Sequence, residues 1–150
     1  MVQCADSLVW ELIKGNNSFV KKTNGRTKRS GSKSFSVEKG NLRSLHRFQS
    51  SGLANSKAVD IIMDDNNTAG LFRKTASKAA TYPAKASQVT PINKDFRRVE
   101  NVVRTQTIDN YYRPDLEKAA LAKMTKVYQA NRRAKDIVKT VPIKKGRGKN

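Results

Sequence analysis

The chain has 150 residues, and its 31 lysines and arginines against 12 aspartates and glutamates leave a formal net charge of +19 at pH 7. Apolar residues make up only 37%, against a usual share of about 45–50%, which excludes a large hydrophobic core. No apolar run approaches the ~18–20 residues of a membrane span, the first residues lack a signal-peptide pattern, and the single cysteine, Cys4, excludes an internal disulfide. We therefore expect a soluble intracellular protein that lies beside an anionic partner.

The N-terminal third predicts a short helix followed by two strands. Asp6 and Ser7 precede the apolar run LVWELI, whose spacing favours a helix capped by Ser7, with a strand as the alternative. Residues 18–22 are a short strand candidate, and residues 35–37 alternate as the returning strand. Between them, residues 23–34 are polar, basic and rich in Gly and Ser, which predicts an exposed hairpin tip or loop.

The middle of the chain contains the clearest strand pattern. Residues 58–63 (AVDIIM) predict a strand, and the turn DDNNTAG leads into residues 70–74, which predict its antiparallel partner. Residues 74–87 are rich in Ala, Lys, Ser and Thr and include Pro83, so we interpret them as an extended arm over the surface.

From Asn93 the apolar spacing becomes helical. Phe96, Val99, Val103 and Thr107 share one face of a helix that should end near residue 110. A second helix should begin at Pro114, since proline favours the first helical position and Asp115 and Glu117 suit the first turn. The apolar stripe of this second helix is Leu116, Ala120, Met124, Val127 and Tyr128.

These elements predict an α+β fold with three parts. Residues 1–92 form a small antiparallel β-rich part with a short N-terminal helix and the basic loop 23–34. Residues 93–134 form a two-helix C-terminal part. Residues 135–150 form a basic extended tail, which contains Pro and Gly and is expected to lack structure without a partner.

Residues that could carry catalysis or hold a metal are few. One histidine, His46, and one cysteine cannot make a four-ligand zinc site, and no recognised catalytic or phosphate-loop motif is present. Asp60, Asp64 and Asp65 lack the spacing of a calcium-binding loop. We therefore expect no enzyme activity, no catalytic residue, no metal, no cofactor and no small-molecule substrate.

The basic residues carry the functional signal, because lysine and arginine bind phosphate oxygens. Six cations lie in loop and strand residues 21–33, and Tyr111, Tyr112 and Arg113 place aromatic rings on which RNA bases could stack beside a cation. No RNA-binding module that recognises base sequence is visible, so RNA binding should depend on the shape and the phosphate backbone of the RNA. The candidate RNA-binding residues are Lys21, Lys22, Arg26, Lys28, Arg29, Lys33, Arg43, Arg47, Lys57, Arg97, Arg98, Arg104, Tyr112, Arg113, Lys118, Lys126, Arg132, Arg133, Lys144, Lys145 and Arg147.

Three blocks of sequence resemble the eukaryotic large-subunit ribosomal protein family L-twenty-eight, of the eukaryote-specific series. They are LVWELIKGNNSFVKK at residues 8–22, FSVEKGNLRSLHRFQSSGLANSKAV at residues 35–59, and DNYYRPDLEKAALAK at residues 109–123. The YRPDL core with its Ala-rich helix is the most specific of these. Residues 23–34 and the tail after Ala134 match poorly.

The resemblance implies a structural constituent of the cytosolic large ribosomal subunit that binds large-subunit rRNA. It also implies that the two-helix part at residues 93–134 packs on RNA, with Tyr112, Arg113 and Lys118 as the best-transferred contacts. Its partners would be rRNA and neighbouring ribosomal proteins, without membrane contact or homo-oligomers, in the cytoplasm after nuclear or nucleolar transit. The alternative is a nucleolar ribosome-assembly factor of the Mak-sixteen-like group, whose N-terminal domain begins similarly. The short basic tail and YRPDL favour the ribosomal protein over that alternative.

Overall fold

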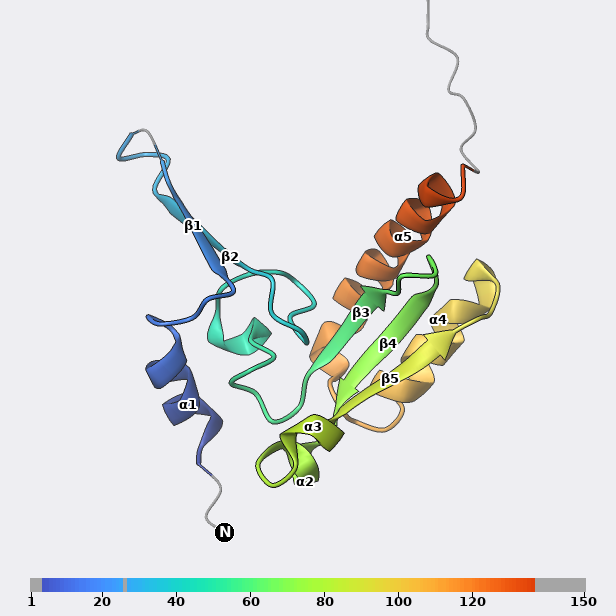
Figure 1. Ribbon diagram of the computed structural model, residues 1–150, viewed down its shortest axis with the longest axis horizontal. Coiled ribbons are helices and arrows are strands. Elements are labelled where there is room, and N and C mark those ends of the chain that lie inside the picture. Colours follow the sequence, from blue (N-terminus) through green and yellow to red (C-terminus); the bar gives the residue numbers. More distant parts are fainter. Residues whose placement is uncertain (1–3, 26, 137–150) are drawn as a thin grey trace, which may run out of the picture.

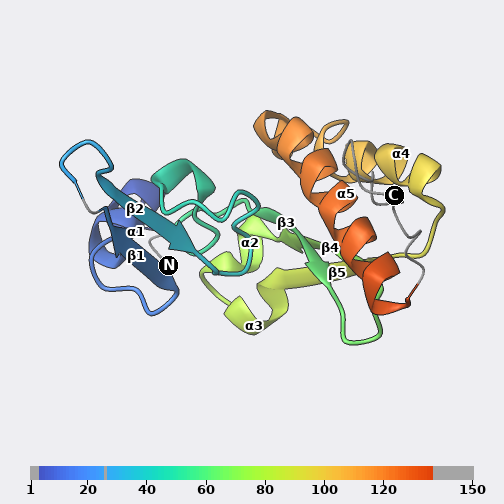
Figure 2. The same cartoon turned by 90° about the horizontal axis from the view of Figure 1, so that it is seen from above.

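The computed structural model describes residues 4–25 and 27–136 and has the α+β fold expected from the sequence. At its centre is a three-stranded antiparallel sheet in the order β3 (Val59–Met63), β4 (Ala69–Lys74) and β5 (Ser87–Ile92). Two helices, α4 (Phe96–Thr107) and α5 (Glu117–Ala134), cover one face of this sheet (Figures 1 and 2). The strand predicted at residues 58–63 and both C-terminal helices are therefore confirmed, although α5 begins at Glu117, after a 3-10 turn at Pro114–Leu116, and not at Pro114 itself.

The hydrophobic core lies between the sheet and these two helices. Val59 and Ile61 of β3 and Leu71 of β4 are at most 2% exposed, and the β3–β4 register pairs Ile61 with Leu71. Val103 of α4 and Ala120 of α5 are fully buried against them. The parts predicted at residues 1–92 and 93–134 thus share one core. Its residues are Leu42, Val59, Ile61, Ala69, Leu71, Ile92, Val99, Val103, Leu116, Ala120 and Met124.

The loop before β3 covers part of the opposite face of the sheet, near Phe72. Gly40 has φ +85°, and a β-carbon built there would lie 3.0 Å from the Ala58 Cβ and 3.2 Å from the Phe72 Cε1. The backbone amide of Gly40 donates a hydrogen bond to the Asp60 carboxylate at 3.3 Å. This close approach of loop and sheet requires a residue without a side chain at position 40.

Helix α1 (Asp6–Ile13) forms where the sequence predicts it, but Ser7 does not cap it. The N-cap position is Ala5, which makes no side-chain cap bond. The Asp6 carboxylate instead accepts hydrogen bonds from the backbone amide and the hydroxyl of Ser56, at 2.9 and 3.0 Å. The helix is therefore fixed by a contact fifty residues away along the chain, and this contact explains the choice of acid before the apolar run.

Residues 74–87 are not the extended arm expected from their composition. They contain two single-turn helices, α2 (Ala76–Ala79) and α3 (Pro83–Ala86), which lead into β5. Strand β5 was not predicted, because Pro91 lies within it and proline is typical of breaks. Its position at the edge of the sheet accommodates that proline, since β4 alone pairs with it.

A second, two-stranded sheet stands apart from the body. Strands β1 (Val20–Asn24) and β2 (Ser32–Ser36) pair antiparallel, so the tip spans residues 25–31 and is shorter than the predicted loop 23–34. Only Ser36, at the base, is buried among the residues of these strands. This hairpin (residues 20–36) and the C-terminal end of α5 project from the same side of the molecule (Figure 1).

Candidate nucleic-acid interface

The hairpin presents its basic side chains to solvent on both faces and at its tip. The register pairs Lys21 with Phe35 and Thr23 with Lys33, so the two lysines share one face, whereas Lys22 lies on the other. A turn between Thr27 and Ser30 closes the tip through a hydrogen bond of 3.1 Å from the Ser30 amide to the Thr27 carbonyl. Its two central residues, Lys28 and Arg29, are exposed.

The outward face of α5 carries a second row of cations. Lys118, Lys126 and Arg133 are exposed, as are Ala122 and Gln129 between them, and these spacings place all five within one sector of the helix. Lys123 points elsewhere and forms an ion pair with the buried Asp60 of β3. The three predicted residues of this row therefore present their charges together, while Lys123 serves to attach α5 to the sheet.

Helix α4 divides its three predicted arginines between two roles. Arg97 and Arg98 are exposed and make no ion pair with any described residue. Arg104 is bound to Glu100 at 2.9 Å and to Glu117 of α5 at 3.1 Å. Since two carboxylates already balance the Arg104 guanidinium, its charge is less available to a phosphate than those of its neighbours.

Tyr112 belongs to the interior framework and does not project as a free platform. Its hydroxyl accepts a hydrogen bond from the Ala58 amide at 3.1 Å and donates one to the Lys74 carbonyl. The Lys57 ammonium and the Arg73 guanidinium each lie 5.7 Å from the centre of its ring. Burial raises the pKa of the Tyr112 hydroxyl, although the neighbouring hydrogen bonds and arginines oppose that rise.

Arg113 is also engaged within the protein. Its guanidinium donates to the Asp115 carboxylate at 2.8 and 2.9 Å, to the Lys57 carbonyl at 2.9 Å and to the Gln49 carbonyl at 3.1 Å. These bonds join the bend before α5 to the loop before β3, and the Arg113 side chain is only 15% exposed. The arrangement gives Arg113 a structural role that sequence reasoning did not predict, because its partners are distant backbone carbonyls.

Tyr111 is the exposed aromatic residue of this bend. It is 85% exposed and has φ +48°, a left-handed conformation that tyrosine rarely adopts. The backbone amides of Tyr112 and Arg113 both donate to the Thr107 carbonyl at 3.1 Å, which fixes the turn around it. Of the two adjacent tyrosines, Tyr112 is therefore packed, and Tyr111 offers its ring to solvent.

The remaining predicted residues lie near the end of α5, in the central loop between β2 and β3, or outside the described residues. Arg132 of α5 is partly exposed, and its guanidinium lies 5.9 Å from the centre of the Tyr128 ring. Arg43, Arg47 and Lys57 are exposed on the segment between β2 and β3. His46 packs its ring 5.0 Å from Trp10, and its Nε2 contacts the Lys14 carbonyl at 2.8 Å, so it helps to attach α1. Four predicted residues lie outside the described residues, as does most of the tail: Arg26, Lys144, Lys145 and Arg147.

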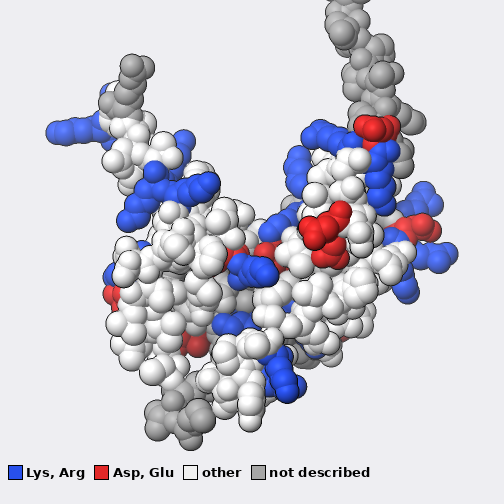
Figure 3. Space-filling view, viewed as in Figure 1, with Lys and Arg blue, Asp and Glu red and all other residues white. Residues whose placement is uncertain are grey.

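Basic side chains gather on the two projections and at the right-hand edge of the molecule, whereas much of the lower body is uncharged in this view (Figure 3). Between Val20 and Ser36 the sequence holds six cations and no acid. Such a surface can bind the regularly spaced phosphates of a nucleic acid that lies across both projections. Among residues 4–25 and 27–136 there is no group of metal-ligating side chains and no helix long and apolar enough to cross a membrane.

Comparison with known proteins agrees with this surface chemistry. The model of the Ribosomal L28e protein family matches residues 8–130. A Dictyostelium discoideum protein named large ribosomal subunit protein eL28 is 33% identical over 132 residues, which cover 87% of this chain and 92% of the relative. Its namesake in Schizosaccharomyces pombe is 28% identical over 134 residues, covering 89% of this chain and 97% of the relative.

A third relative supports the assignment over a shorter stretch. The Caenorhabditis elegans protein named large ribosomal subunit protein eL28 is 42% identical over 57 residues, which cover 38% of this chain and 41% of the relative. The family match includes the hairpin, the sheet, α4 and α5 as far as residue 130, so it spans all the residues of the hydrophobic core. The chain therefore belongs to the Ribosomal L28e protein family.

Proposed function

We propose that this chain is a structural constituent of the cytosolic large ribosomal subunit, where it binds and stabilises large-subunit rRNA through phosphate contacts. The proposal rests on the distribution of positive charge over the surface of this family member. Exposed cations line the hairpin and the outward face of α5, and the hairpin and the C-terminal end of α5 project from the same side of the molecule. These cations have few acidic neighbours, so an external polyanion is the partner that balances them.

The hairpin needs such a partner more than any other described element. An isolated two-stranded hairpin is marginally stable in water, and this one buries only Ser36 among its strand residues. Bonds at its base hold it to the body, including the Val37 amide to the Phe19 carbonyl at 3.1 Å and the Ser36 amide to the Ser44 carbonyl at 3.0 Å. Phosphates placed beside Lys21, Lys28 and Lys33 would stabilise the part beyond that base.

The row of cations on the outward face of α5 would bind a second stretch of the RNA phosphate backbone. Lys118, Lys126 and Arg133 leave the same sector of a helix that Lys123 and Asp60 fix to the sheet. A rigid helix holds these charges at constant separation, whereas the hairpin tip can adjust to the RNA surface. The protein would therefore link two rRNA segments, reading their shape and backbone without a base code. The predicted partners also include neighbouring large-subunit proteins, and assembly would require passage through the nucleolus.

A salt series of binding to large-subunit rRNA fragments tests the proposal. Each phosphate contact should contribute about −0.7 to −0.9 to the slope of log K against log salt concentration. The measurement uses the full-length chain and a duplex DNA of equal length as the reference polyanion. An association that is insensitive to salt would contradict phosphate binding.

The place of the protein in the cell is tested by sedimentation of extracts. A tagged full-length chain should follow the large subunit and polysomes in a sucrose gradient, and magnesium depletion should move it from polysomes to free large subunits. Restriction of the chain to nuclear precursor particles would instead identify a ribosome-assembly factor, and the proposed function would be wrong.

A further inference from the structure

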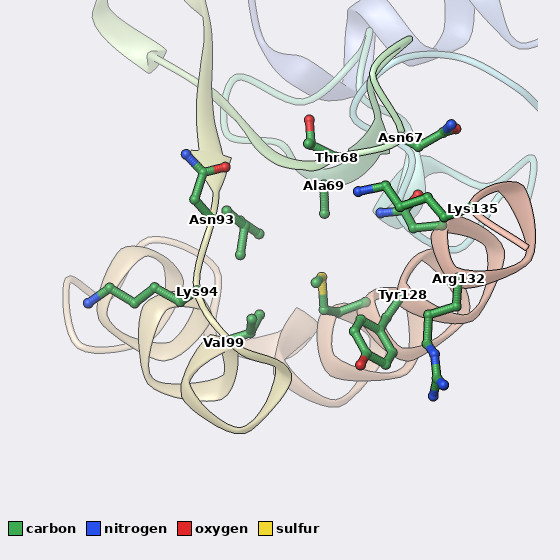
Figure 4. A pocket seen from close by; sticks show the side chains of 12 residues that line it. Asn67, Thr68, Ala69, Asn93, Lys94, Val99, Tyr128, Arg132 and Lys135 are labelled. Carbon is green, nitrogen blue, oxygen red and sulfur yellow. The ribbon is translucent and has the colours of Figure 1, made fainter. Parts of the chain in front are cut away.

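A pocket of about 600 Å³ lies away from the hairpin, where the β3–β4 turn, the end of β5, helix α4 and the C-terminal end of α5 meet. Its apolar part is formed by Ala69, Ile92, Val99 and Met124, which also belong to the core. Figure 4 shows the side chains of Ala69, Val99 and Tyr128 around the hollow. The volume lies within the range of about 300–1,000 Å³ that small ligands occupy.

The rim of this pocket is polar and basic. The carboxamides of Asn67, Asn93 and Asn131 each offer hydrogen-bond donors and an acceptor. Three cations complete the rim, and in Figure 4 two of them, Lys94 and Arg132, extend outward from it. None of the described lining residues is acidic, and the three cations, Lys94, Arg132 and Lys135, form no ion pair with a described residue.

The aromatic wall is held in place by its neighbours. The rings of Tyr128 and Phe96 lie 4.7 Å apart with an angle of 30° between their planes. The Arg132 guanidinium lies 5.9 Å from the centre of the Tyr128 ring. Aromatic rings and guanidinium planes are the surfaces against which proteins hold bases that leave a single-stranded RNA segment.

We propose that this pocket takes one nucleotide extruded from the bound RNA, with its base inside and its flanking phosphates at Lys94, Arg132 and Lys135. The proposal rests on the proposed function, because it names the part of the RNA that this site would bind. Charge and ring shape together favour this occupant over a side chain of a neighbouring protein. An acidic side chain balances one cation and brings no ring, whereas a nucleotide within RNA brings a phosphate on either side of a flat base.

Titration of the full-length chain, labelled for NMR, with AMP, GMP, CMP and UMP tests the pocket. At least one nucleotide should shift the methyl signals of Ala69, Ile92, Val99 and Met124 in a saturable way. Ribose 5-phosphate, which lacks a base, should shift only signals of the rim. Methyl signals that stay unchanged with all four nucleotides, or that move equally with ribose 5-phosphate, would overturn the proposal.

A matched set of variants adds a second test. Tyr128→Leu should weaken nucleotide binding at least about fivefold, the lower end of the effect of losing an aromatic contact to a base. Tyr128→Phe keeps the ring and should bind as the unaltered chain does, as should Tyr82→Leu, which alters an exposed tyrosine outside the pocket. Unchanged binding by a folded Tyr128→Leu chain would count against the proposal. If that variant does not fold, the methyl titration of the unaltered chain decides.

The salt series with rRNA fragments, run on the same protein, separates this inference from the proposed function. If rRNA binding depends steeply on salt but the pocket methyl signals do not shift with any nucleotide, the proposed function remains supported and only the nucleotide site is overturned. A density map of the assembled subunit gives the direct result. A base between Ala69 and Tyr128 supports the proposal, and a protein side chain in that place overturns it.

Discussion

The Arg113 guanidinium holds the Asp115 carboxylate through two hydrogen bonds of 2.8 and 2.9 Å, in the paired geometry that suits a planar donor and a planar acceptor. The same guanidinium also donates to the carbonyls of Lys57 and Gln49. One side chain in the bend before α5 therefore fixes the loop before β3, more than fifty residues away. The order of the central loop depends on the bend, and both belong to the segment matched by the family model.

Arg113→Ala should destabilise the free protein by about 2–3 kcal/mol, because it removes charge-assisted hydrogen bonds from a largely buried side chain. Urea unfolding of the full-length chain measures the loss. Arg98→Ala, an exposed arginine of α4, is the matched control and should change stability by less than about 0.5 kcal/mol. Equal stability of the two variants would show that Arg113 is not structural.

The Arg113–Asp115 pair should also make stability depend on acid pH. The hydrogen bond from Arg113 lowers the pKa of the Asp115 carboxyl below its ordinary value of 3.8, so the unfolded chain takes up the proton more readily. The stabilisation is complete above pH 3.8 and is lost as the pH falls through the lowered pKa of the folded state. Asp115→Asn should therefore differ most from the unaltered chain near neutral pH. A constant difference in unfolding free energy down to about pH 2 would contradict this linkage.

Removal of two cations from the α5 row should reduce the salt dependence of rRNA binding. Replacing Lys118 and Lys126 with Gln should lower the magnitude of the log–log slope by about 1.4–1.8, if each contacts one phosphate. Lys78→Gln with Lys85→Gln is the matched control, since these lysines lie on α2 and α3 at the end of the molecule opposite the projections (Figure 1). Equal slopes for the two double variants would exclude the α5 row from the interface.

Gly40→Ala should destabilise the fold by about 1–3 kcal/mol, because the new β-carbon combines a left-handed φ with contacts that are too close. The nearest atoms are the Ala58 Cβ at 3.0 Å and the Gly52 Cα at 3.1 Å. Gly15→Ala is the control, since a β-carbon there meets nothing within 4 Å. Thermal unfolding of both variants provides the comparison, and a Gly40 variant as stable as the Gly15 variant would refute the packing argument.

Tyr111→Gly should stabilise the free protein while it weakens rRNA binding. The left-handed conformation at φ +48° costs a tyrosine about 1–2 kcal/mol that glycine avoids, partly offset by the greater chain entropy of glycine. Tyr111→Ala removes the ring but keeps the strain, so it should bind rRNA as the glycine variant does without the gain in stability. Unaltered rRNA affinity in both variants would exclude Tyr111 as a stacking residue.

Periodicity and turn chemistry were sufficient to predict most of the elements that form the core, with β5 as the exception. The strand pair around residues 58–74 and the two C-terminal helices each place apolar residues at the spacing of one buried face. Strand β5 escaped prediction, because Pro91 is tolerated only where the strand has a neighbour on one side. The single-turn helices α2 and α3 are too short for a 3.6-residue period to appear in the sequence.

The basic composition of the candidate interface could be predicted from the sequence, but the roles of its individual residues could not. Local sequence identifies Lys28 and Arg29 as exposed, because their turn is polar on every side. It cannot reveal that Tyr112 reaches Ala58 or that Arg104 bridges Glu100 and Glu117, since those partners come together only in the folded chain. Residues Lys94 and Lys135 acquire a shared position at the pocket through the same long-range packing.

Because the β1–β2 hairpin contributes no apolar side chain to the core, residues can be inserted at or deleted from its tip without a cavity opening in the body. We expect relatives of this chain to vary in length at residues 25–31 while they retain the bend at residues 107–113. The length of the hairpin can then change to suit the proposed rRNA partner without a change in the stability of the fold.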